Sequence, residues 1–181
     1  MPIYFVILLS LNACSPLSHS NEYAAKVRYA ELLKTPTAYT VAAEIKYLLS
    51  PTAKEALHKG IPLAWDILIE IRQSGLLFNN AVYQKKLPYS LQFHALLNQY
   101  EVKTPGQIEM FLTLNSAINF MSMIHDTSPI DKAMLKPEQH YELAVRTVFN
   151  REFLPIPLRP VAYLDDQWFL SSDWLIWPIQ K

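Results

Sequence analysis

The sequence predicts a mainly β fold, an antiparallel β-sandwich-like single domain of about eight strands with two short helices. Three observations predict this fold class. Several segments alternate between apolar and polar residues with a period of two, which is typical of strands with one buried face. Most links between these segments are too short for the helical crossovers of parallel strands. The length of 181 residues suits one domain. An α+β fold of two strand-helix-strand halves is the alternative.

The first two strands follow from alternation. Residues 39–50 place apolar side chains at odd positions, and residues 61–72 repeat this pattern more sharply with β-branched and aromatic residues. In the second segment Asp66, Glu70 and Arg72 share the opposite face. We expect that face to be exposed and its charges to form salt bridges, because the two carboxylates are too far apart along a strand to share acid and base roles.

A short helix is expected between these two strands. Ser50 can act as its N-cap, Pro51 suits the first helical position, and Gly60 suits a left-handed C-terminus. The second helix is expected from Thr113 to Ile124, because apolar residues there recur at helical spacing. Both helices are short, so the sheets must supply most of the core.

Four further segments are expected to form strands. Alternation predicts strands over residues 91–98 and 141–150, and a short strand over residues 107–112 leads into the second helix. Three prolines, at positions 155, 157 and 160, then separate the domain body from a last strand over residues 161–171.

Composition excludes several classes of function. Sixteen basic residues balance sixteen acidic ones, and the longest basic run is the pair Lys85–Lys86, so no nucleic acid is expected as a partner. The histidines show no metal-ligand spacing, and with three glycines a phosphate-binding loop is not expected. No Gly-x-Ser-x-Gly motif is present. We therefore expect no metal, no cofactor and no enzymatic activity.

The first fourteen residues resemble a bacterial lipoprotein export signal. The apolar run from Ile3 to Leu11 has the length of a signal peptide core and is too short to span a bilayer. Leu11 and Ala13 occupy the positions that a lipobox requires before Cys14, the only cysteine. We expect residues 1–13 to be a signal peptide, Cys14 to carry acyl chains such as palmitate, residues 14–23 to form a flexible tether, and residues 24–181 to form one β-rich domain.

Two features of this leader leave alternatives open. The residues before the apolar run carry no positive charge, so the true start can lie upstream of Met1. An ordinary signal peptidase can instead cut after Ser20, which would give a soluble periplasmic protein. If Cys14 is acylated, Ser15 carries no retention charge, and the protein is expected on the periplasmic side of the outer membrane.

Tryptophans are concentrated near the C-terminus. Residues 168–178 hold three of the four, and Trp174 and Trp177 are candidates for an interaction surface, since tryptophan is frequent in binding hot spots. The alternative is a flap that closes over the core.

Six short motifs together resemble a known family. They are Glu55–Leu63, Leu87–Ser90, Asn98–Val102, Tyr141–Arg146, Leu154–Leu158 and Ser171–Trp174. Their order and spacing resemble a family of exported proteobacterial proteins catalogued as domain of unknown function 4390, over about Ala24 to Pro178. The resemblance implies a Gram-negative envelope protein of β-rich fold, and it brings no catalytic residues.

The function expected from the sequence is a lipid-anchored, periplasm-facing envelope protein that is not an enzyme and binds another envelope protein. It would contact the membrane through its N-terminal lipid. A carrier or sensor of a small apolar ligand is the alternative, because a β-rich body with 12% aromatic residues can enclose a cavity. The sequence does not indicate the oligomeric state.

Overall fold

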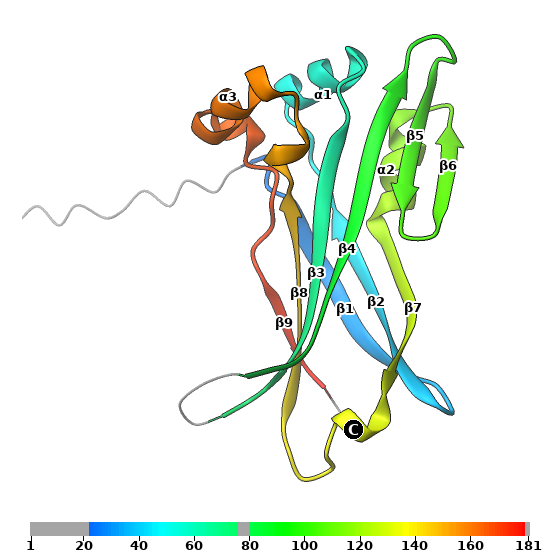
Figure 1. The fold of residues 1–181 in the computed structure, drawn as a ribbon, viewed down its shortest axis with the longest axis vertical. Coiled ribbons are helices and arrows are strands. Elements are labelled where there is room, and N and C mark those ends of the chain that lie inside the picture. Colours follow the sequence, from blue (N-terminus) through cyan, green and yellow to red (C-terminus); the bar gives the residue numbers. More distant parts are fainter. Residues whose placement is uncertain (1–21, 76–79, 180–181) are drawn as a thin grey trace, which may run out of the picture.

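A computed structural model describes residues 22–75 and 80–179 as two antiparallel sheets that face each other (Figure 1). The molecule is elongated, and the strands run along its long axis. Helices gather toward one end, and the β1–β2 turn lies at the other. This confirms the mainly β, sandwich-like fold expected from the alternating segments.

The smaller sheet has three strands in the order β1-β2-β7. They are β1 (Lys26–Lys34), β2 (Ala38–Lys46) and β7 (Met123–Asp131). Both pairings are antiparallel, and each contains an irregularity. In β7 this irregularity falls between Asp126 and Ile130, opposite Val41 and Tyr39 of β2. Inward-facing residues such as Val41, Ile45 and Ile124 are almost completely buried.

The larger sheet has six strands in the order β6-β5-β4-β3-β8-β9. They are β3 (Leu63–Gln73), β4 (Asn80–His94), β5 (Gln99–Thr104), β6 (Gln107–Phe111), β8 (Tyr141–Phe149) and β9 (Leu175–Pro178). In β3 the residues Trp65, Ile67, Ile69 and Ile71 are buried and alternate with partly exposed neighbours, as the sequence predicts. β5 pairs only with the last five residues of β4, so among the described residues the first part of β4 has a free edge on that side.

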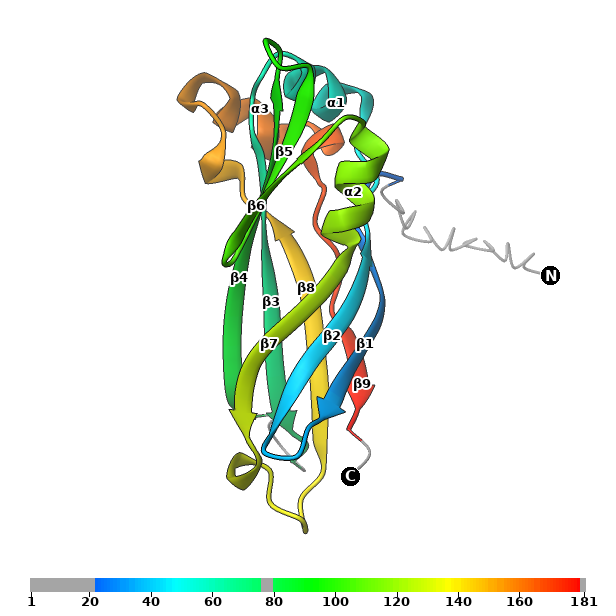
Figure 2. The same ribbon diagram turned by 90° about the vertical axis from the view of Figure 1, so that its right-hand side faces the viewer.

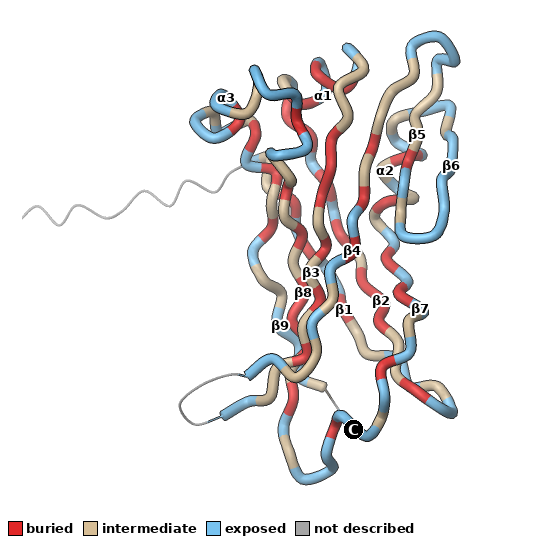
Figure 3. The backbone as a smooth tube through the Cα atoms, in the orientation of Figure 1, coloured by how far each residue is buried: buried red, intermediate tan, exposed pale blue. Residues whose placement is uncertain are grey.

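The core lies between the sheets and extends under the helices (Figure 3). Its aromatic centre consists of Trp65, whose ring meets those of Tyr47 and Phe149 edge-on at 5.2 and 5.3 Å between centroids. Trp168 stacks on Phe149 from the other side at 6.0 Å. The indole N–H of Trp65 donates to the backbone carbonyl of Leu170 at 3.2 Å. The segment after β8 is therefore fastened to the sandwich by one continuous aromatic cluster.

Three α-helices complete the described chain: α1 (Pro51–His58), α2 (Leu114–Ser122) and α3 (Arg159–Leu164). Ser50 is the N-cap of α1, and its hydroxyl accepts from the backbone N–H of Ala53 at 3.0 Å. Gly60 has the positive φ of 82° expected just after this helix. Short 3-10 turns lie at Lys132–Met134, Arg151–Phe153, Ile156–Leu158 and Asp166–Trp168.

Three expectations about element boundaries were wrong. Residues 161–171 do not form a strand: they contain most of α3 and the last 3-10 turn, because the preceding prolines favour compact turns and helix starts. The strand expected over residues 91–98 is the end of the longer β4, and residues 95–98 form a turn. The second helix ends at Ser122, and Ile124 belongs to β7, which the sequence did not indicate.

Candidate functional site

An ion pair connects the two sheets along one side of the sandwich. The Lys85 ammonium of β4 donates to Asp126 Oδ1 of β7 at 2.8 Å, and it also donates to the Ser128 hydroxyl. Lys85 stands opposite Ile69 and Asp126 opposite Val41, so both side chains project from the faces that carry core residues. The Asp126 side chain is only 6% exposed. This pair therefore lies between the sheets rather than on the outer surface.

Two tyrosines of β4 flank this ion pair. Burial raises the pKa of Tyr89, and the negative charge of Asp126 adds to the shift. The pKa of Tyr83 is raised by the same two causes in the same order. A cavity of about 240 Å³ opens beside the pair and is lined by Lys86, His125 and Thr127 among others. Its lining mixes these polar side chains with Leu87, Pro88, Tyr89 and Pro105.

The chemistry of this cluster favours a structural role. Lys85 donates to both Asp126 and Ser128, so the cluster holds β4 and β7 together. The first part of β4 and the outer side of β7 are both free strand edges. Inward-pointing charges are one means by which proteins prevent such edges from pairing with other chains. We assign the Lys85–Asp126 pair to that role.

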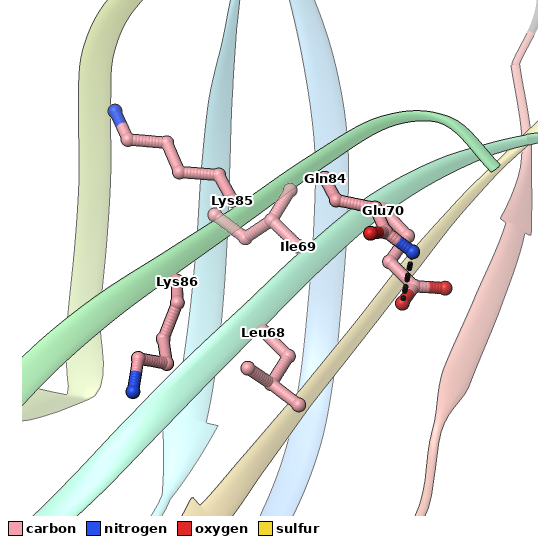
Figure 4. A pocket seen from close by; sticks show the side chains of 6 residues that line it. All are labelled: Leu68, Ile69, Glu70, Gln84, Lys85 and Lys86. Carbon is pink, nitrogen blue, oxygen red and sulfur yellow. Dashed lines mark hydrogen bonds between the residues drawn. The ribbon is translucent and has the colours of Figure 1, made fainter.

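The outer face of β3 carries the acidic residues noted in the sequence. Glu70 accepts from Arg72 Nε at 2.7 Å and from Gln84 Nε2 at 3.3 Å, and Lys86 lies 3.4 Å from Asp66. A depression of about 270 Å³ lies along β3 and β4. Figure 4 shows six of the side chains that line it, with Lys85 and Lys86 extending away from Glu70 and Gln84. The expected salt bridges are confirmed, and each carboxylate has its own cation.

The candidate tryptophans do not form one surface. Trp174 is half-buried, with the guanidinium of Arg72 at 4.4 Å and that of Arg146 at 5.2 Å from its ring centroid. Trp177 lies in β9 opposite the buried Leu143 and is 47% exposed. Arg72 and Arg146 alternate with the buried residues of β3 and β8, whereas Leu143 is one of those buried residues, so the two tryptophans lie on opposite faces of the sheet. The third tryptophan, Trp168, is part of the core.

The four outer strands of the two sheets differ in how well they are protected against pairing. β7 contains Pro129, an irregular register and the inward-pointing Asp126. β1 has a register irregularity and four charged residues, and β9 has four residues and ends at Pro178. β6 has a regular register, no proline, no basic residue and one acidic residue, Glu109. Its shortness is its one protection, so β6 is the outer strand most open to a partner strand.

The side chains of β6 give this strand an exposed apolar face. Phe111 packs against Phe120 of α2 at 5.1 Å between ring centroids, so the alternate residues Ile108 and Met110 project away from α2. Ile108 is 61% exposed, and Leu112 immediately after the strand is more exposed still. The free edge of β6 and its apolar face, formed by Ile108, Met110 and Leu112, are the candidate interaction site, here called the β6 edge.

The hydrogen-bonding pattern of β6 follows from its turn. Pro105 and Gly106 form a two-residue turn, with Thr104 opposite Gln107. In such a hairpin the closing pair exchanges backbone hydrogen bonds, and this exchange recurs at every second pair. Gln107, Glu109 and Phe111 therefore bond to β5. The backbone N–H and C=O groups of Ile108 and Met110 point to the free edge.

Two residues of the predicted export signal are not covered by the structure. Cys14 and Ser20 lie outside the described residues. Across residues 22–75 and 80–179 no helix has both the length and the apolar character needed to cross a bilayer. The same residues contain no group of three His, Cys, Asp or Glu side chains placed to hold a metal ion.

The fold and its exposed strand edge define a single-domain β-sandwich-like protein. The chain belongs to the family described as domain of unknown function (DUF4390), whose model matches residues 22–178. This match covers both sheets and confirms the resemblance seen in the six motifs. Comparison with curated proteins and with solved structures gave no match.

Sequence reasoning missed both the Lys85–Asp126 pair and the β6 edge. The ion pair joins residues 41 positions apart, and no local pattern places them together. The strand at residues 107–112 was expected, but its outer position in the sheet was not. The lack of proline and lysine in that strand is a signal that could have drawn attention to it.

Proposed function

We propose that this chain is a lipid-anchored, non-enzymatic interaction module of the cell envelope that binds an extended segment of another envelope protein along β6. The observation that carries this proposal is the contrast among the outer strands: β6 alone presents a regular edge without proline or basic residues. Added strands gain affinity from backbone hydrogen bonds and specificity from alternate side chains. The matching segment would carry apolar residues at every second position, to pack on Ile108 and Met110.

The lipid-anchored part of the proposal rests on the leader sequence. Cys14 follows an apolar run and a lipobox-like Leu11 and Ala13. Acyl chains on that cysteine would hold the domain at the periplasmic side of the outer membrane, where it would meet its partner. Cleavage after Ser20 would instead give a soluble periplasmic form, which would have the same β6 edge.

A site-specific crosslinking experiment in intact cells tests this function. A photoreactive residue at Ile108 is expected to capture a distinct envelope protein. Ile176 in β9 is the matched control, because it is also an exposed isoleucine in an outer strand of the same sheet. Ile108→Lys should reduce capture of the same partner from position 110. Absence of adducts at Ile108, identical adducts at both positions, or adducts with a second copy of this chain would contradict the proposal.

A further inference from the structure

One end of the molecule combines the helices with exposed leucines. Thr52 at the start of α1 donates from its hydroxyl to Gln167 Oε1 at 2.7 Å, and His58 at the end of α1 lies 2.9 Å from the Tyr100 hydroxyl of β5. These contacts place α1, the segment of α3 and the β4–β5 turn at the same end, as Figures 1 and 2 show.

The apolar residues at this end are unusually exposed. Leu96 in the β4–β5 turn is fully exposed, and Leu97 beside it is 62% exposed. Ile156, just before α3, and Leu164, the last residue of α3, are 75% and 86% exposed. We call these four residues the apolar end. Isolated exposed apolar residues are common on proteins, but here two separate segments at the same end of the molecule each carry two of them.

The domain chain also begins at this end. Lys26, the first residue of β1, pairs with Lys46, the last residue of β2. Only four residues lie between Lys46 and the start of α1. Seven residues separate Cys14 from Glu22, where the described chain starts, and the eight steps from Cys14 to Glu22 can span at most about 28 Å. An acyl group on Cys14 would therefore keep this end of the domain near the bilayer surface.

We infer that the apolar end contacts the lipid bilayer, with Leu96, Leu97, Ile156 and Leu164 entering the interface between head groups and acyl chains. This inference rests on the proposed lipidation of Cys14 and assigns the orientation that the anchored domain adopts. Apolar side chains that enter this interface add to the attachment given by acyl chains. The contact would direct the long axis of the sandwich away from the membrane and leave the β6 edge accessible.

The test measures whether single positions in the lipidated full-length protein contact lipid or water. Leu164→Cys and Leu96→Cys variants carry a spin label and are reconstituted in vesicles of phosphatidylethanolamine and phosphatidylglycerol. Leu33→Cys is the control, because Leu33 is an exposed leucine near the opposite end of β1. Collisions with oxygen, which concentrates in lipid, are compared with those of a water-soluble nickel complex. Unchanged thermal unfolding confirms that each variant folds.

The expected result is at least a fivefold higher oxygen-to-nickel accessibility ratio at positions 96 and 164 than at position 33. Equal ratios at all three positions would overturn the inference. Low accessibility to both reagents at 96 and 164 would overturn it too, because it would indicate contact with protein. Failure of the protein to carry acyl chains is detected separately by mass spectrometry and would contradict the proposed anchoring. Partner capture at Ile108 is independent of this result.

Discussion

Lys85 Nζ and Asp126 Oδ1 lie 2.8 Å apart and connect the six-stranded sheet to the three-stranded sheet. Asp126 also accepts at Oδ1 from the backbone N–H of Ser128 at 3.1 Å, which supports the irregular part of β7. The other carboxylate oxygen, Oδ2, is buried and has no hydrogen-bond partner within the described residues. The pair thus places opposite charges between the free edges of β4 and β7. We call this junction of the two sheets the seam.

Replacing one member of this pair is expected to destabilise the fold. Asp126→Asn keeps the size of the side chain and leaves the Lys85 charge without its partner. We expect the free energy of unfolding to fall by about 1–3 kcal/mol, since Lys85 is partly exposed and can regain some hydration. Chemical denaturation measures this change. The double variant Lys85→Met with Asp126→Leu should recover most of the loss, because no charge remains unpaired.

The exposed pair Lys59–Glu55 is the matched control for this experiment. Its atoms are 2.6 Å apart, but both side chains are about two-thirds exposed. Glu55→Gln should leave the free energy of unfolding almost unchanged, because solvent screens an exposed ion pair. If the Lys85 and Asp126 variants were strictly additive in the double variant, the two residues would not be coupled. The double variant should also associate more readily at high concentration, because the seam would lose its inward charges.

The raised pKa of Tyr89 predicts that the folded protein loses stability at alkaline pH. Burial and the nearby Asp126 raise its pKa in the folded state above the unfolded value of about 10. The folded protein therefore holds this proton more tightly, so the contribution of Tyr89 is complete below the unfolded pKa and is lost as pH rises through the higher folded pKa. Tyr89→Phe should show a shallower loss of stability above pH of about 10.

Urea unfolding of both proteins across this pH range measures the effect. Every other titratable group is present in both proteins, so its contribution cancels when the two profiles are subtracted. Parallel profiles would contradict the raised pKa of Tyr89.

Trp174 is predicted to stabilise the fold through its two guanidinium neighbours. Trp174→Leu keeps an apolar side chain but removes the aromatic face beneath Arg72 and Arg146, so we expect a loss of about 1 kcal/mol. Trp177→Leu is the control. It lies beside no cation in the described part of the chain and should change stability by less than about 0.5 kcal/mol. Thermal unfolding compares the two variants, and equal losses would show that the arginines contribute nothing specific.

Cys14 is predicted to determine membrane attachment. Cys14→Ala removes the proposed acylation site and should move the protein out of the membrane fraction of lysed cells. Ser20→Leu, which would block the alternative cleavage, should leave the native distribution unchanged. If Cys14→Ala partitioned like the native protein, lipidation at this residue would be excluded.

The sequence predicted those elements whose signals are local. The strand over residues 61–72 alternates clearly, with Ala64 and Leu68 as exceptions, so its buried face was assigned correctly. Ser50, Pro51 and Gly60 determine the limits of α1 through capping chemistry that depends on neighbouring residues alone. Each of these signals lies within about a dozen residues and needs no knowledge of the sheet order.

Other elements depended on contacts that the sequence does not show. The segment over residues 161–171 is held by Trp168 against Phe149 and by Leu170, whose carbonyl accepts from Trp65. These contacts stabilise turns and a short helix where alternation favoured a strand. β4 was recognised only at its end, because Lys85 faces the core side and disrupts the alternation that identifies a strand. Lys85 therefore both obscures β4 in the sequence pattern and forms the ion pair with Asp126.

Hydrogen exchange of the β6 amides, with and without the captured partner, tests strand addition most directly. In the free protein, Ile108 and Met110 should exchange rapidly, while Glu109 and Phe111 should be protected by β5. In the complex we expect strong additional protection at Ile108 and Met110. Met110→Pro, which removes an outward N–H, should abolish binding while the β5–β6 pairing remains. Unchanged exchange at Ile108 and Met110 in the complex would contradict the proposed function.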